Sequence, residues 1–133
     1  MSKLIFSGKN TVGTYNIGSG FNDGVNCIVE EPYSGKTYVG GYFTTFNGLS
    51  QRCLIRLNSD GSKDTTFDIG SGFGNGYSVE SLVVRPDGKI YVGGYFNSYS
   101  GTSTGFGIIR LNEDGTWDSS FDINDGFNNR VVS

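Results

Sequence analysis

The sequence contains two copies of one unit, and this repetition constrains the fold more than any other feature. The run Gly40-Gly41-Tyr42-Phe43 recurs as Gly93-Gly94-Tyr95-Phe96, and Phe67-Asp68-Ile69 recurs as Phe121-Asp122-Ile123, at spacings of 53 or 54 positions. A period of roughly 50 residues built from short strands is typical of a propeller blade. Blades bury their apolar faces mainly against neighbours, and roughly three units are normally needed for stability. We therefore expect a chain with two units to need partners or to be part of a longer array.

Each unit divides into four expected strands separated by turn residues. They span 25–30, 36–43, 52–57 and 64–69 in the first copy, and 79–85, 89–96, 107–111 and 117–123 in the second. Glycine is the commonest residue with 22 copies, and 10 Phe and 8 Tyr stand between the turns. Turn residues that alternate with aromatic and β-branched residues, without helical spacing, predict an all-β fold. The fold class expected is two four-stranded propeller-type blades with partial blades at both ends.

The whole chain is expected to form a single repeat domain over 1–133. Repeat 1 covers 22–73 and repeat 2 covers 74–127, while 1–21 is interpreted as a partial blade and 128–133 as the start of a further strand. The partial blade is inferred from the match between 15–21 and 67–73. In the last segment, Arg130, Val131 and Val132 are expected interface residues. The ends are completed either by a neighbouring copy or by further repeats of a longer protein.

Composition argues against several classes of function. The net charge of −3 and the scattered lysines and arginines argue against nucleic-acid binding. No apolar run is long enough to span a bilayer, and the apolar stretch near the start is too short for a signal peptide. The two cysteines, Cys27 and Cys53, are interpreted as small buried thiols, with a disulfide between them as the alternative.

We expect no enzymatic activity. The chain has no histidine, which removes the commonest general base and the commonest transition-metal ligand. A carboxylate-pair hydrolase would have to use Asp60, Asp64 or Glu80. These acids fall mostly in turns, without an evident apolar pocket to raise the pKa of one of them.

Two features indicate that sheets stack closely. The paired glycines in the repeated Tyr-Val-Gly-Gly-Tyr-Phe run remove side chains where backbones or a bulky aromatic must approach closely. The nearly continuous apolar run Leu82-Val83-Val84 predicts a strand that is buried on both faces.

Two turns carry oxygen-rich loops that resemble calcium sites in their spacing. Alternating oxygen ligands around a glycine can wrap a hard cation. Calcium is the one cofactor considered for them. The favoured alternative is that Asp-Gly makes a tight hairpin turn while the other polar side chains cap local backbone groups. The residues concerned are Asn58, Asp60, Ser62 and Asp64, with Asn112, Asp114, Thr116 and Asp118 in the second copy.

Aromatic residues are the other candidates for a binding surface. Tyr42, Phe43, Tyr95 and Phe96, with Phe46 and Tyr99, could form a surface that stacks on sugars or binds proteins. The favoured interpretation is that most of them fill the space between blades. Trp117 replaces Lys63 between the repeats, so it is expected to have a role of its own, at a ligand or at a subunit contact.

The residues resemble the delta-60 repeat family. The resemblance is carried by the run from Arg56 to Phe67, by the matching run from Arg110 to Phe121, and by Arg85-Pro86-Asp87-Gly88-Lys89 followed by the second glycine pair. It implies a β-propeller-like arrangement, as in long bacterial surface or secreted proteins and in some phage tail and virion proteins. The family carries no established catalytic set.

Together these features predict a non-enzymatic structural and interaction protein that assembles with identical or related copies. A phage virion or tail is the expected setting, with an extracellular or cell-surface location as the alternative. The rival functions are a lectin-like or calcium-dependent adhesion module that binds glycans, and a piece of a longer bacterial surface propeller.

Overall fold

The computed structural model describes residues 19–74, 76–105 and 107–121, and its regular elements are all β-strands. The first repeat forms β1 (Val25–Glu30), β2 (Thr37–Gly41), β3 (Thr45–Phe46), β4 (Leu49–Ser50) and β5 (Leu54–Leu57). The second forms β6 (Ser78–Val84), β7 (Ile90–Tyr95), β8 (Ser98–Tyr99), β9 (Thr102–Ser103) and β10 (Ile108–Leu111). The expected all-β fold class is confirmed. A search of these residues found no helix that could span a membrane.

The two repeats fold in the same way. Each forms a three-stranded antiparallel sheet, in the order β1-β2-β5 in the first repeat (sheet 1) and β10-β7-β6 in the second (sheet 2). The register also repeats, because Cys27 pairs with Gly40 and Ser81 pairs with Gly93. In both sheets a bulge in the first strand comes just before this pair. The sequence repeat is therefore a structural repeat.

The last strand of each expected blade is different from the prediction. In place of strands over 64–69 and 117–123, the described residues make one antiparallel bridge each, Leu57 with Lys63 and Leu111 with Trp117. The chain then leaves the sheet because the carboxylate of Asp64 accepts hydrogen bonds from the N–H and the hydroxyl of Thr66, at 3.0 and 2.6 Å. Such local bonds compete with the ladder of a sheet. The short hairpins β3-β4 and β8-β9 form instead in the segments expected to be loops.

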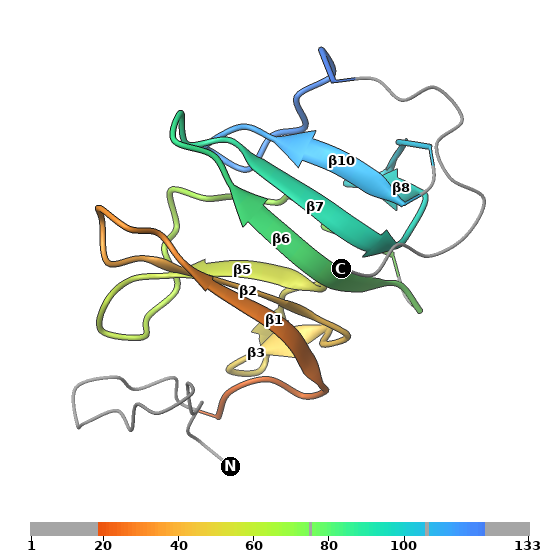
Figure 1. Cartoon of the computed structure of the whole chain (residues 1–133). Coiled ribbons are helices and arrows are strands. Elements are labelled where there is room, and N and C mark those ends of the chain that lie inside the picture. The colour runs from red at the N-terminus through yellow and green to blue at the C-terminus, as the bar shows by residue number, and fades with distance from the viewer. Residues whose placement is uncertain (1–18, 75, 106, 122–133) are drawn as a thin grey trace.

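The two sheets pack face to face, with β6 lying against β1 and β2 (Figure 1). The side-chain amide of Asn26 also crosses between the sheets and donates to the carbonyl of Val79 at 3.0 Å. A core built from both repeats fills the interface. Its buried members include Tyr38, Leu54, Phe67, Phe73, Val79, Leu82, Ile90, Val92, Ile109 and Leu111. A smaller cluster, with Val39, Ile55 and Leu57, lies on the opposite face of sheet 1.

The glycine pairs permit this packing, as the sequence predicts. A Cβ added at Gly40 would lie 2.5 Å from Cγ1 of Val79 on the facing sheet. A Cβ added at Gly94 would lie 2.2 Å from the carbonyl oxygen of Ser78 on the neighbouring strand. Gly40 therefore allows sheet 1 to pack closely on sheet 2. Gly94 allows β7 to approach β6 closely at the bulge.

A phenylalanine before each sheet closes the small hairpin of the repeat. The ring of Phe73 lies 4.7 Å from the ring of Phe96 and 4.9 Å from that of Tyr99. Phe21 has the same role in the first repeat, at 4.4 Å from Phe43 and 5.0 Å from Phe46. The match between 15–21 and 67–73 therefore has a structural counterpart at its last residue. Residues 1–18 of the expected partial blade and the expected strand at 128–133 lie outside the described residues.

Sheet 2 is not buried on both faces. Leu82 points into the interface and is buried, but Val83 is 58% exposed on the outer face. The prediction from the Leu82-Val83-Val84 run was therefore wrong for this face. The physical reason is that, in the part of the chain that the structure describes, no further sheet packs against the outer side of β6.

Candidate binding site between the two repeats

Each repeat contains a carboxylate that is held between a lysine and an arginine. In repeat 1, Oδ2 of Asp64 lies 2.8 Å from Nε of Arg56 and 3.0 Å from Nζ of Lys36. The Arg56 guanidinium also lies over the ring of Phe67, at 4.9 Å from its centroid. In repeat 2, Oδ2 of Asp118 has the same two contacts, with Arg110 at 2.8 Å and Lys89 at 3.0 Å. The two ion pairs with arginine are largely buried, so they are structural elements of the repeat.

These contacts lower the pKa values of both carboxyl groups. Burial alone would raise the pKa of Asp64, but hydrogen bonds from Thr66, Lys36 and Arg56 together outweigh it and hold the pKa well below its usual range. The pKa of Asp118 is lowered in the same direction, mainly by hydrogen bonds from the hydroxyl of Ser120 and from Lys89. Both groups are ionised wherever the fold is intact at ordinary pH.

The chain is expected to lose stability in acid. A carboxyl group with a lower pKa in the folded state contributes stability above its unfolded pKa of about 3.9, and that stability is lost as the pH falls toward the folded value. Urea denaturation between pH 7 and pH 2 should therefore show a free energy of unfolding that begins to fall below about pH 5. A free energy of unfolding that stays constant down to pH 2 would contradict this assignment.

The oxygen-rich loops adopt the hairpin turn that the sequence favoured. The N–H of Asn58 donates to the carbonyl of Ser62 at 2.8 Å, and Oδ1 of Asp60 accepts from the N–H and the hydroxyl of Ser62. In repeat 2, Asn112, Asp114 and Thr116 repeat this arrangement.

The same loops place an ammonium group beside their oxygens. Nζ of Lys36 donates to Oδ1 of Asn58 at 2.8 Å, and Nζ of Lys89 donates to Oδ1 of Asn112 at 2.7 Å. Each lysine therefore bridges the asparagine and the last aspartate of its loop. Calcium binding, the alternative that the sequence did not favour, stays untested. In this structure the positive charge beside each loop belongs to a lysine ammonium group.

The predicted surface aromatics divide into two groups. Phe43 and Phe96 are fully buried, as filling side chains must be, whereas Tyr42 and Tyr95 are 41% and 38% exposed. Tyr99 is buried and Trp117 is partly buried. The expected interface residues Arg130, Val131 and Val132 lie outside the described residues.

The remaining sequence candidates have separate structural partners. Asp60 caps its own turn, Asp64 is paired with basic side chains, and Glu80 accepts a hydrogen bond from the hydroxyl of Ser78. Cys27 and Cys53 are free thiols. Burial raises the pKa of Cys27 to about 11 and that of Cys53 to about 12. High thiol pKa values make both cysteines weak nucleophiles at neutral pH.

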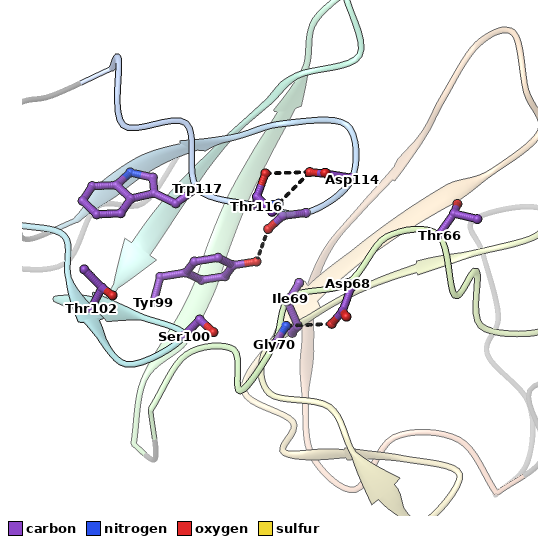
Figure 2. Close-up of a pocket in the computed structure, with 11 residues that line it drawn as sticks. Thr66, Asp68, Ile69, Gly70, Tyr99, Ser100, Thr102, Asp114, Thr116 and Trp117 are labelled. Atoms are coloured by element: carbon purple, nitrogen blue, oxygen red, sulfur yellow. Dashed lines mark hydrogen bonds between the residues drawn. The ribbon is translucent and has the colours of Figure 1, made fainter.

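A pocket of about 590 Å³ lies where the two repeats meet (Figure 2). Three segments form its walls: residues 66–70, which leave repeat 1, and residues 99–102 and 114–117 of repeat 2. Trp117 and Thr102 lie at one end, and Thr66 and Asp68 lie at the other, with Tyr99 between them (Figure 2). The full lining is Thr66, Asp68, Ile69, Gly70, Tyr99, Ser100, Thr102, Asp114, Gly115, Thr116 and Trp117.

Two hydrogen bonds, one between the repeats and one within repeat 2, fix the walls of this pocket. The N–H of Asp68 donates to the carbonyl of Asp114 at 2.9 Å, and the hydroxyl of Tyr99 donates to the carbonyl of Gly115 at 2.6 Å. A Cβ at Gly115 would lie 2.4 Å from the carbonyl oxygen of Asp68, so only glycine allows this close approach. The positive φ of 93° at the same residue also requires glycine. The pocket is thus held by a tight contact between the exit segment of one repeat and the turn of the next.

The pocket is negatively charged. Asp68 and Asp114 are carboxylates, and no lysine or arginine is found among the lining residues that the structure describes. The pKa of Asp114 is lowered chiefly by the hydrogen bond from the Thr116 hydroxyl. Burial raises the pKa of Tyr99, and the two nearby carboxylates raise it further. The arrangement therefore offers acceptor oxygens beside an indole ring.

Sequence reasoning found only part of this pocket. It singled out Tyr99, Asp114, Thr116 and Trp117 for separate roles, but it did not bring them together with Asp68, Ser100 or Thr102. An alignment of the two repeats could have indicated the pocket, because the repeats differ at positions that line it. Tyr99, Thr102 and Trp117 stand where repeat 1 has Phe46, Leu49 and Lys63, so three departures from the repeat line one pocket.

One protein family matches the chain. Its model, described as "Domain of unknown function (DUF5122) beta-propeller", matches residues 34–67 and 85–121. The matched stretches lie one in each repeat and together make up more than half of the sequence. No curated protein and no solved structure matches the chain.

Proposed function

Because the chain belongs to the DUF5122 family of β-propeller domains, we propose that it is a non-enzymatic structural and interaction module that assembles by packing its sheets face to face. One observation carries this proposal. The outer face of sheet 2 repeats, residue by residue, the face through which sheet 1 packs on sheet 2. Such a face is suited to another sheet of the same kind.

The register defines the two equivalent faces. On sheet 1, the side chains on the packed face come from Cys27, Val29, Tyr38, Leu54 and Arg56. On sheet 2, the side chains on the outer face come from Ser81, Val83, Tyr91, Ile108 and Arg110. Phe67 and Phe121 extend these faces, because each lies under the arginine of its own repeat.

Exposure distinguishes these two faces. Tyr38 and Leu54 are fully buried, whereas their counterparts Tyr91 and Ile108 are only partly buried. Val83 is 58% exposed. Uncovered branched aliphatic and aromatic side chains on one face of a sheet favour association with another apolar surface.

The arginine on the outer face of sheet 2 lacks the backbone acceptor that its counterpart on sheet 1 has. Nη1 of Arg56 donates to the carbonyl of Glu113, in the turn of the next repeat, at 3.1 Å. The same atom also donates to the hydroxyl of Tyr38 at 3.0 Å. Nη1 of Arg110 has the counterpart of this second bond, to the hydroxyl of Tyr91 at 3.4 Å, and no other hydrogen bond of this atom is seen among the described residues. Arg110 is therefore placed to accept a turn like that of residues 112–115 from a further repeat.

We assign that further repeat to a second copy of this chain. Sheet 2 packs on sheet 1 through the face that carries Leu82 and the turn at 112–115. The equivalent face of sheet 1 carries Ile28, which is 37% exposed, and the turn at 58–61. Val39 and Ile55 on that side are already buried within the chain. The contact would therefore centre on Ile28 and on the carbonyl of Ser59, the counterpart of Glu113.

The test is the solution mass of the full chain by size-exclusion chromatography with light scattering. We expect a discrete multiple of the monomer that Val83→Arg converts to monomer, because a charge at the centre of an apolar contact cannot be desolvated without a partner. Thr65→Arg is the matched control, since Thr65 is exposed and lies in the segment that leaves repeat 1, outside the two contacting surfaces. A monomer at all concentrations, or a multiple that Val83→Arg leaves unchanged, would overturn the proposal.

The finer setting is also part of the proposal. The likeness to the delta-60 repeat supports a phage virion or tail component first, and a bacterial surface protein second. Mass spectrometry of purified virions and of cell-surface fractions from the source would separate them, since the chain should be found in one and not in the other.

A further inference from the structure

We propose that the pocket between the repeats binds a neutral saccharide. This goes beyond assembly, because the pocket lies at the junction of the two repeats within one chain and not on the outer face of sheet 2. Its volume of about 590 Å³ lies within the usual range of about 300–1,000 Å³ for small-molecule sites.

The chemistry of the lining favours a ligand with many hydroxyl groups. Asp68 and Asp114 supply carboxylate oxygens, and Ser100 and Thr102 supply hydroxyls. A sugar offers hydroxyl donors to the carboxylates and an apolar C–H face to the partly buried indole of Trp117. Aromatic side chains combine a large contact area with a defined orientation, which suits a flat ring.

The charge of the pocket excludes anionic ligands. Two carboxylates line it, and the described lining residues include no basic side chain that could offset a phosphate or carboxylate of the ligand. Each carboxylate already accepts a hydrogen bond from its own loop, Asp68 from the N–H of Gly70 at 2.8 Å and Asp114 from the N–H of Thr116 at 3.0 Å. Asp114 also accepts from the hydroxyl of Thr116 at 2.6 Å. Each carboxylate keeps open acceptor positions, to which neutral hydroxyls can donate.

The fold that the two repeats share does not require the hydroxyls of Tyr99 and Thr102 or the indole of Trp117. Repeat 1 folds into the same sheet and hairpin with Phe46, Leu49 and Lys63 in place of Tyr99, Thr102 and Trp117. The hydroxyl of Tyr99 fixes the carbonyl of Gly115 and so positions the turn that carries Asp114. Thr102 replaces an apolar leucine with a hydroxyl at the rim. Tyr99, Thr102 and Trp117 therefore give repeat 2 hydroxyl groups and an indole ring that repeat 1 does not have.

The test uses the intrinsic fluorescence of the full chain. Trp117 is the single tryptophan, so its emission reports directly on the pocket. We would titrate glucose, galactose, mannose, N-acetylglucosamine, lactose and cellobiose, with arginine amide as a cationic comparison. At least one sugar should give a saturable change in emission. The phosphorylated form of that sugar should bind at least about tenfold more weakly, because of the two carboxylates.

Variants that restore the repeat 1 residues separate a site from a surface effect. Thr102→Leu should weaken binding about tenfold or more in the fluorescence titration, since it removes a hydrogen-bonding group at the rim. Trp117→Lys, followed by saturation-transfer NMR, should abolish binding. Leu49→Thr and Lys63→Ala in repeat 1 are the matched controls and should leave the affinity unchanged.

Several results would overturn the proposal. These are the absence of a saturable signal with every sugar, binding of arginine amide alone, or unchanged affinity in both Thr102→Leu and Trp117→Lys. Unfolding is monitored separately by circular dichroism, and both substituted residues are wholly or partly exposed. Because the solution mass does not enter this test, failure of the saccharide site and failure of the assembly proposal are distinguishable.

Discussion

Replacement of Asp64 by alanine is expected to destabilise the chain by about 3–5 kcal/mol, the range found when one partner of a buried ion pair is removed. The side chains of Asp64 and Arg56 are only 4% and 6% exposed. Without the carboxylate, the guanidinium would stay buried against Phe67 with no opposite charge, and Lys36 would lose one of its two acceptors. Urea denaturation at pH 7 measures the loss.

Asp118→Ala is the matched control for this prediction. Asp118 has the same lysine and arginine partners, but its arginine is 16% exposed, so water can solvate the charge that remains. We expect a smaller loss of stability than for Asp64→Ala. Equal losses in the two variants would contradict the idea that burial at the repeat interface sets the cost.

Replacement of Gly94 by alanine is the other change expected to have a large effect, about 3 kcal/mol or more. The added methyl group would lie 2.2 Å from the carbonyl oxygen of Ser78 and 3.0 Å from the N–H nitrogen of Glu80. Both are backbone atoms of β6, so relief requires the strands to separate and the bulge to be lost. The midpoint of urea denaturation would report this loss.

Gly24→Ala provides the control for the glycine prediction. Its added Cβ would meet only the ring of Tyr42, at 3.8 Å, which is an ordinary contact. The stability of this variant should therefore stay close to that of the parent chain. If Gly94→Ala were as stable as Gly24→Ala, the close approach of β6 and β7 would not be required for the fold.

Much of the fold could be predicted from the sequence because it depends on local pattern. Strand β1 was predicted over the residues that it occupies, and the glycine pairs were correctly interpreted as places of close approach. The fourth strand could not be predicted in the same way. The residues from Asp64 to Ile69 have strand-like composition, but Asp64 turns the chain by binding the backbone of Thr66. Propensity does not record that competition.

The candidate site was only partly predictable. A loop with the spacing Asn-x-Asp-Gly-x-x-Asp lacks any local feature that separates a calcium ligand set from a hairpin. Lys36, the cation that bridges Asn58 and Asp64, lies just before β2, 22 positions before Asn58. The pocket could not be predicted from local sequence either, because its carboxylates, Asp68 and Asp114, belong to different repeats.

By itself, the sequence determined the repeat, the all-β class, the turns and the main strands of each sheet. All of these follow from the alternation of side chains and from glycine, within a few residues of the chain. Only the tertiary structure decided which carboxylates are paired with lysine and arginine, which face of sheet 2 stays uncovered, and where a pocket forms. The ion pairs depend on contacts between segments of one repeat that are far apart in the sequence, such as Lys89 and Asp118, 29 positions apart. The pocket depends on segments of both repeats and forms only once sheet 1 has packed on sheet 2.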